Sequence, residues 1–224
     1  MNAMAVRCDM AYPEKCSIVN SNAYALSAQV SAAGGEPVIV EKARDTREDV
    51  ARALRAALRE DVVVLSGGVS VGDYDVVREG LADAGVELAF WAVRMKPGKP
   101  VSFARHGAVP VLGLPGNPVS AWVTFELFVR PGLRRMLGDP RPQRPRVQVT
   151  LESALRHTPG RTEFARARLV RRGGQLFAQP LARQSSGALS SMVSVDALLE
   201  IPAERADLSA GTTLNAVLIQ SFPP

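Results

Sequence analysis

Cysteine and histidine are scarce in this chain of 224 residues, which contains only Cys8, Cys16, His106 and His157. The spacing of the two cysteines fits no zinc motif, so we expect free thiols in a reducing cytoplasm. With only two histidines besides, the sequence argues against a His/Cys metal site and against a catalytic triad.

Long hydrophobic runs are also missing. No stretch of about 18 apolar residues could cross a membrane, and residues 1–10 lack the charged-then-apolar pattern of a signal peptide. Apolar residues make up 46% of the chain and charged residues 22%, which is ordinary for a soluble globular protein. The sequence therefore predicts a cytoplasmic protein with no membrane partner.

Acidic residues are few only in the last third of the chain. Residues 1–140 carry 16 basic and 16 acidic side chains, whereas residues 141–224 carry 11 arginines, no lysine and 6 acids, so the net charge of +5 arises there (11 − 6). These arginines are scattered and have little aromatic interleaving, which favours a solvated, mildly basic surface over a nucleic-acid site. No nucleic-acid partner is expected.

Strand and helix patterns alternate from residue 17 to residue 137. The apolar and glycine pattern predicts helices over about 23–33, 46–59, 74–85 and 119–137. It predicts strands or extended segments over 17–19, 37–40, 61–65, 86–95, 101–104 and 109–112. Such alternation predicts an α/β fold with a doubly wound, mostly parallel sheet that binds ligands at the carboxyl ends of its strands.

The pattern changes after a Pro-rich segment over 139–145. Residues 147–151 and 164–170 alternate with period two, and Arg171-Arg172-Gly173-Gly174 is typical of a hairpin turn. Together with a short helical piece near 189–192, this predicts a small β-barrel. The chain is therefore expected to hold an α/β domain over residues 1–140 and a β-barrel domain over residues 145–224.

A glycine-rich stretch over residues 65–75 follows the apolar strand at 61–65. Glycines let the backbone approach a ligand closely, and the start of the following helix favours anions. The stretch offers hydroxyl donors and carboxylates that could bind a metal ion or cap the helix. Its candidate residues are Ser66, Gly67, Gly68, Ser70, Gly72, Asp73 and Asp75. A simple tight turn with an aspartate cap is the alternative.

Two further loops follow predicted strands. Lys96-Pro97-Gly98-Lys99-Pro100 holds two of the four lysines in a chain with 23 arginines, which suggests compact charges placed at a phosphate. The other loop offers backbone N–H groups and an amide at the start of a helix, through Pro115, Gly116, Asn117, Pro118 and Ser120. By the carboxyl-end rule, the three loops are expected to meet at one pocket; two surface lysines on a turn remain the plainer interpretation.

These three motifs, in this order, resemble those of the MoeA/gephyrin E-domain family of molybdopterin molybdotransferases. The motifs are Ser66-Gly67-Gly68-Val69-Ser70-Val71-Gly72 with Asp75, Lys96 to Pro100, and Gly113 to Ala121. Residues 17–137 resemble the family's pterin-binding domain, whose fold is similar to that of MoaB/MogA-type proteins. Residues 145–224 resemble the family's C-terminal barrel. The resemblance covers the second half of the usual family architecture.

The resemblance implies insertion of molybdate into molybdopterin or adenylylated molybdopterin, with release of AMP and assistance from Mg²⁺. It implies catalytic roles for Asp75, Asp45, Lys96 and Lys99, with Asp75 as the metal ligand. A carboxylate beside a glycine loop can hold Mg²⁺ against a pyrophosphate, and lysines can attract molybdate or phosphate. It also implies a homodimer, and a molybdopterin adenylyltransferase as the partner in the pathway.

The sequence departs from the family in two places. The family's TGDE motif is absent, with Arg7-Cys8-Asp9-Met10 before the first predicted strand, and Asn20-Ser21-Asn22 stands where the family often has Asp-Ser/Thr-Asn. Pterin binding is therefore better supported than turnover. A non-catalytic pterin-binding or scaffold fragment and a molybdopterin adenylyltransferase remain as alternatives, although the latter class ends its central strand with a TGGTG-type loop.

Overall fold

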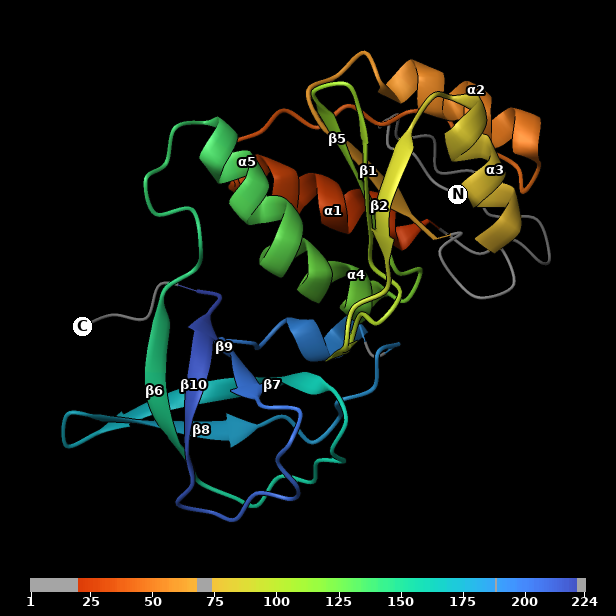
Figure 1. The fold of residues 1–224 in the computed structure, drawn as a ribbon. Helices are drawn as coiled ribbons and strands as arrows, with labels where there is room; N and C mark the ends of the chain where they lie inside the picture. Colours follow the sequence, from red (N-terminus) through yellow and green to blue (C-terminus); the bar gives the residue numbers. More distant parts are fainter. Residues whose placement is uncertain (1–19, 68–73, 188, 221–224) are drawn as a thin grey trace. The chain divides into compact units, whose positions relative to one another are not determined.

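The chain divides into two compact units, which Figure 1 shows in a computed structural model. The structure describes residues 20–67, 74–187 and 189–220. The α/β unit comprises Met1–Val93 and Pro100–Pro142, and the barrel unit comprises Arg94–Lys99 and Gln143–Pro224. The expected strand at residues 17–19 lies outside the described residues. The chain thus passes between the units three times, whereas the sequence pattern suggested a single passage in the Pro-rich segment.

The α/β unit is built on a four-stranded sheet in the order β1-β5-β4-β2. The bounds of its strands are β1 Val63–Ser66, β2 Glu87–Trp91, β4 Ser102–His106 and β5 Val109–Leu114. Those of its helices are α1 Ser21–Ala32, α2 Arg47–Ala57, α3 Tyr74–Asp83, α4 Pro118–Thr124, the π-helix η1 Phe125–Val129 and α5 Arg130–Met136. The α/β fold class is confirmed.

The described sheet is mixed rather than mostly parallel. β1 and β5 are parallel, but β5 with β4 and β4 with β2 are antiparallel. The reason is local: His106 pairs with Val109 across the two-residue turn at Gly107, whose φ is +56°, and such a turn makes a hairpin. Residues 37–40, expected as a strand, have no strand partner in the described part of the chain, and Pro37 has no N–H to donate.

Helices cover both faces of this sheet. One core cluster joins α2 and α3 to one face through Val50, Leu54, Val77, Leu81, Val63, Leu65 and Val111. A second cluster joins α1 and the α4–α5 helix to the other face through Leu26, Phe125, Val129, Leu112 and Leu114. Alternate strand residues thus point to opposite faces, as strand geometry requires.

Glycine and proline adjust the packing of these helices. A methyl group at Gly80 of α3 would lie 2.9 Å from Cβ of Val50, so glycine permits the close approach of α2 and α3. The expected helix over 119–137 forms with a π turn over Phe125–Val129, which ends two residues before Pro131. Because Pro131 has no N–H and its ring crowds the preceding turn, a widened turn accommodates it.

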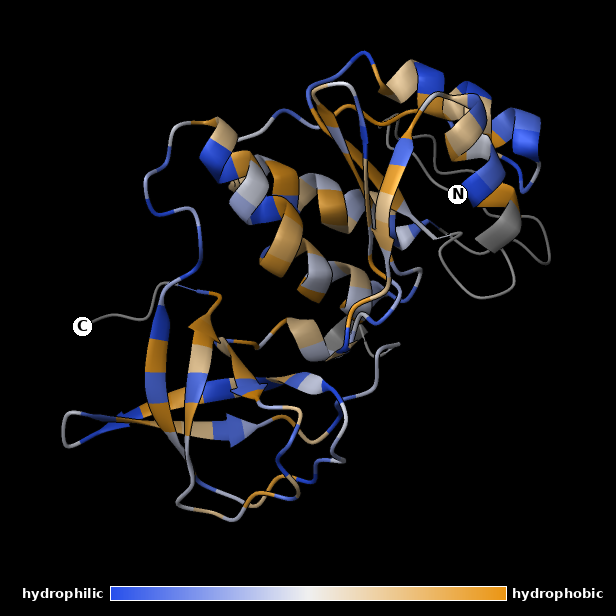
Figure 2. Cartoon of the chain, in the orientation of Figure 1, coloured by the Kyte–Doolittle hydropathy of each residue, from blue (hydrophilic) through white to orange (hydrophobic). Residues whose placement is uncertain are grey.

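The barrel unit closes as β7-β8-β6-β10-β9, with β9 pairing back to β7 and with β3 added beside β7. Its bounds are β3 Met95–Lys96, β6 Arg146–Leu151, β7 Thr162–Arg172, β8 Gln175–Pro180, β9 Ala197–Ile201, β10 Thr213–Leu218 and the 3₁₀ turn η2 Leu189–Met192. The predicted small β-barrel is confirmed, with five strands, and hydrophobic and hydrophilic residues alternate along β6 in Figure 2. Small side chains such as Ala165, Ala167 and Ala178 fill its narrow interior.

Candidate functional site

Two of the three predicted loops meet at the carboxyl ends of β1 and β5. The parallel register pairs Ser66 with Leu114, and the N–H of Gly67 donates to the carbonyl oxygen of Leu114 at 3.2 Å. A methyl group at Gly116 would lie 3.6 Å from Cα of Gly67. Gly67 has a φ of +81°, a conformation that favours glycine. The register of the sheet therefore brings the two motifs side by side.

Asn22, at the start of α1, joins these two loops. Its Nδ2 donates to Oγ of Ser66 at 2.9 Å and to the carbonyl oxygen of Gly116 at 2.8 Å. The residue is only 8% exposed, and its Oδ1 is buried with no hydrogen-bond partner among the described residues. Asn20 caps α1 through its side chain. The link from Asn22 to the two loops comes from the tertiary fold.

The other candidates of the third loop lie at the start of α4. Pro115 and Ser120 are buried, Asn117 is exposed at the N-cap position without a side-chain capping bond, and Pro118 is the first helical residue. A proline there leaves no unsatisfied N–H of its own. The Asn117 amide is therefore not used to cap the helix.

The predicted acidic residues are only partly described. Gly68, Ser70 and Gly72 lie outside the described residues, as does the side chain of Asp75, although α3 begins at Tyr74 as expected. Asp45 is exposed just before Thr46, which caps α2. Among the described residues, no three His, Cys, Asp or Glu side chains form a group that could hold a metal ion. The magnesium site at Asp75 stays a prediction.

The lysine loop belongs to the barrel unit. Lys96 is on β3 and stands beside Glu163 in the parallel pairing with β7. This corrects the expectation that the loop extends from the same sheet as the other two. Lys96 Nζ lies 3.0 Å from Oε1 and 3.1 Å from Oε2 of Glu163, while Lys99 is exposed and has no ion pair in the described part of the chain.

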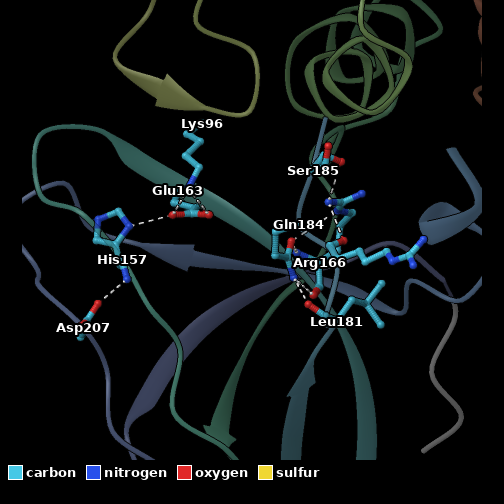
Figure 3. Close-up of polar contacts among 9 residues, drawn as sticks. Lys96, His157, Glu163, Arg166, Leu181, Gln184, Ser185 and Asp207 are labelled. Carbon is cyan, nitrogen blue, oxygen red and sulfur yellow. Dashed lines mark hydrogen bonds and ion pairs between the residues drawn. The ribbon is translucent and has the colours of Figure 1, made fainter. Parts of the chain in front are cut away.

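Glu163 and His157 were not among the predicted site residues. Figure 3 shows Lys96 and His157 directed toward the same carboxylate. His157 Nδ1 lies 2.8 Å from Oε2 of Glu163, and the two side chains are 1% and 5% exposed. Alternation along β7 places Glu163 in the row of Ala165 and Ala167, which face the barrel interior. That alternation could have indicated a buried carboxylate.

Arg166, on the same strand, is 1% exposed. Its guanidinium donates to the carbonyl oxygens of Arg183 and Ser185 at 3.1 and 3.2 Å and to Oγ of Ser191, and its Nε lies 3.4 Å from Oε1 of Gln184. These partners are neutral oxygen atoms, and burial lowers the pKa of Arg166. The side chain thereby ties β7 to the segment that carries η2 (Figure 3).

A hollow of about 280 Å³ lies elsewhere in the α/β unit. Its lining includes Val30, Val38, Val62, Val64 and Leu133. None of the predicted site residues line it, and most of its lining side chains are apolar. The meeting of the Ser66 and Gly116 loops is thus a better candidate site than this hollow.

Comparisons with known proteins agree with this geometry. The family described as "Probable molybdopterin binding domain" matches residues 12–135, and "MoeA C-terminal region (domain IV)" matches residues 148–219. Molybdopterin molybdenumtransferase 2 of Mycobacterium tuberculosis is 37% identical over 206 residues, covering 88% of this chain and 50% of its own length. Molybdopterin molybdenumtransferase of Nostoc sp. is 36% identical over 214 residues, covering 92% and 48%.

Solved structures show the same relationship. The molybdopterin biosynthesis MoeA protein of Pyrococcus horikoshii matches 99% of this chain and 53% of its own chain, with a TM-score of 0.78 and 27% identity. The chain thus spans about half the length of the relatives it matches. With a molybdopterin-binding domain match over more than half of its residues and a MoeA C-terminal match over most of the rest, the chain belongs to the MoeA family of molybdopterin-binding proteins.

Proposed function

We propose that this chain acts in molybdenum cofactor biosynthesis as the substrate-binding part of a molybdopterin molybdotransferase. The reaction is insertion of molybdate into adenylylated molybdopterin, with release of AMP. The observation that supports it best is the meeting of Ser66-Gly67 with Gly116, which Asn22 bridges at the carboxyl ends of β1 and β5. Ligands of open α/β sheets bind at this edge.

Each unit, taken by itself, carries groups that suit this reaction. The loops at Ser66 and Gly116 offer backbone N–H groups and neutral side chains, which suit the polar edges of a pterin and its phosphate. Lys96 and Lys99 offer ammonium groups for phosphate or molybdate oxygens. Asp45 and Asp75 would act on the adenylate, with Mg²⁺ bound at Asp75 to polarise its phosphate.

Several finer features belong to the same proposal. The protein would work in the cytoplasm as a homodimer and would receive adenylylated molybdopterin from a molybdopterin adenylyltransferase. No helix in the described ranges is long and apolar enough to cross a membrane. Analytical ultracentrifugation, alone and with that adenylyltransferase, tests both associations.

The reaction can be tested directly on the purified chain. Adenylylated molybdopterin, molybdate and MgCl₂ are added under anaerobic conditions, and AMP release is followed by chromatography. Replacing exposed Lys99 by alanine is expected to reduce turnover about tenfold or more, because one charged contact is lost. Lys42→Ala is the matched control, since Lys42 is an exposed lysine of the α/β unit. Equal rates for the two variants would contradict the role of Lys99.

A second candidate is a binding module that holds molybdopterin without turnover. It is favoured by the sequence motif that departs from the family, since Arg7-Cys8-Asp9-Met10 stands before the first predicted strand and the TGDE motif is absent. Saturable binding of adenylylated molybdopterin without AMP release, with molybdate present, would support it. Release of pyrophosphate from ATP and molybdopterin would instead indicate an adenylyltransferase.

A further inference from the structure

We propose that Glu163 is a positioning residue for Lys96, and that His157 holds Glu163 in place. These three side chains form the Lys96–Glu163–His157 cluster in the barrel unit (Figure 3). The inference rests on the proposed function only where it assigns the Lys96 ammonium to an anionic group of the substrate. The position of the amine itself follows from the contacts among these three side chains.

The carboxylate is fixed by the barrel framework. Glu163 is paired through its backbone with Ile201 of β9 and with Lys96 of β3, so strands flank it on both sides. Its side chain is 5% exposed. A buried carboxylate is costly unless its oxygens have partners, and here Lys96 and His157 supply them.

His157 is fixed just as closely. Its backbone N–H donates to Oδ1 of Asp207 at 2.7 Å, and nearby Leu155 pairs with Leu208. Because a carboxylate can only accept, the bond to Glu163 assigns the imidazole proton to Nδ1. Nε2 is buried and has no hydrogen-bond partner among the described contacts. The imidazole therefore holds Glu163 from the buried side through one N–H.

Lys96 approaches the same carboxylate from its exposed side. The side chain of Lys96 is 48% exposed, against 5% for that of Glu163. A lysine has four rotatable bonds, and an exposed ammonium would sample many positions. Two contacts of 3.0 and 3.1 Å to a rigid carboxylate restrict it to one region while leaving N–H groups for a ligand. Lys99 in the same loop has no carboxylate partner within the described ranges.

The position of the amine can be measured without substrate. Limiting acetic anhydride labels lysines in competition, and mass spectrometry compares Lys96 with Lys99. We expect Lys96 to react at least about threefold more slowly in the parent protein, since the amine must leave Glu163 before it reacts. Glu163→Gln should abolish this difference. Glu200→Gln, which alters another barrel carboxylate paired with Arg146, should preserve it. Equal rates in the parent, or slow labelling retained in Glu163→Gln, would overturn the proposal.

Two histidine variants test the other contact. His157→Asn can place an amide N–H near the position of Nδ1 and should keep Lys96 slow, whereas His157→Phe removes the donor and should raise its rate. Circular dichroism and thermal unfolding confirm that each variant is folded. If the His157→Phe variant is folded and Lys96 is still labelled slowly, the role proposed for His157 is contradicted.

A double-mutant cycle separates positioning from a structural role. Lys96→Gln and Glu163→Gln are each expected to lower kcat/KM for adenylylated molybdopterin about tenfold, and the double variant no further than Lys96→Gln alone. Multiplying losses would show that Glu163 acts apart from Lys96 and would overturn the inference. If the parent neither binds nor turns over substrate, the proposed function fails, while the labelling experiment still decides whether Glu163 holds Lys96.

Discussion

The α/β unit and the barrel unit present different chemistry in the described part of the chain. In the α/β unit, the groups that meet are Asn22, Ser66 and Gly116, and they are uncharged. In the barrel unit, they are Lys96 and Glu163 with His157. The first set offers neutral hydrogen-bonding groups, and the second set contains an ion pair. Among the described residues, neutral polar groups thus meet in the α/β unit and charged groups in the barrel unit.

The physical reason lies in the cost of burial. Amide and hydroxyl groups can be buried with one or two hydrogen bonds each, so the ends of two strands and a helix suffice. A buried carboxylate needs partners on several sides. The closed barrel supplies them, because β7 is paired with β9 and β3 and the His157 segment is tied to Asp207. The chain places the lysine motif there by sending Arg94–Lys99 into the barrel.

The largest expected effect concerns Asp75, the charged residue that the sequence predicts at the otherwise neutral site of the α/β unit. Replacing Asp75 by asparagine should reduce the proposed Mg²⁺-dependent adenylate hydrolysis more than about 100-fold, because it removes the charge that is proposed to hold the metal. Asp73→Asn should be mild, since asparagine caps a helix nearly as well as aspartate. AMP release, measured with folded variants, checks both. Loss only in the Asp73 variant would reverse the assignment.

The free energy of unfolding can test the neutral contacts of Asn22 in the α/β unit. Asn22→Ala removes both donors to Ser66 and Gly116 and should lower the free energy of unfolding by about 3 kcal/mol. Asn20→Ala, which removes only a helix cap, should cost about 1 kcal/mol. Urea denaturation of both proteins gives the values. Equal costs would mean that the Asn22 bridge adds nothing beyond local helix stability.

In the barrel unit, removing Lys96 and removing the charge of Glu163 are expected to lower the free energy of unfolding by different amounts. Lys96→Met leaves the buried Glu163 without its cation and should cost about 2 kcal/mol of unfolding free energy. Glu163→Gln leaves only a half-exposed lysine, which water can solvate, and should cost about 1 kcal/mol. Urea denaturation at pH 7 compares them. A larger cost for the glutamine variant would show that the carboxylate is not the buried partner that needs compensation.

The smallest effect is expected for a charge pair on the surface of the α/β unit. Arg47 of α2 binds Asp83 of α3, and this hydrogen bond holds the pKa of Asp83 below its usual range. A depressed carboxyl pKa stabilises the fold above the unfolded value of about 3.9, and that contribution is lost as the pH falls through the folded pKa. Asp83→Asn should therefore lower Tm by about 2 °C or less at pH 7, and the difference should shrink as the pH falls below the unfolded value. A Tm difference that stays constant as the pH is lowered would contradict this cause.

Local patterns predicted most elements of both units. Helices α2 and α3 form within the expected ranges, the Arg171–Gly174 turn joins β7 and β8, and the 3₁₀ turn forms at Leu189–Met192. These features depend on a few neighbouring residues, so the sequence carries them directly. The mixed sheet could not be predicted in this way. The direction of each strand depends on its partners and, for β4 and β5, on the tight turn at Gly107.

The sequence by itself determined which residue types were available for chemistry: glycine loops, one lysine-rich loop and two helix starts. Only the tertiary structure decided where they go. It joined Ser66 and Gly116 through Asn22, and it placed Lys96 on a barrel strand beside a glutamate 67 residues away in the chain. Strand register and side-chain burial arise from contacts between distant segments, and periodicity within one segment does not encode the partner.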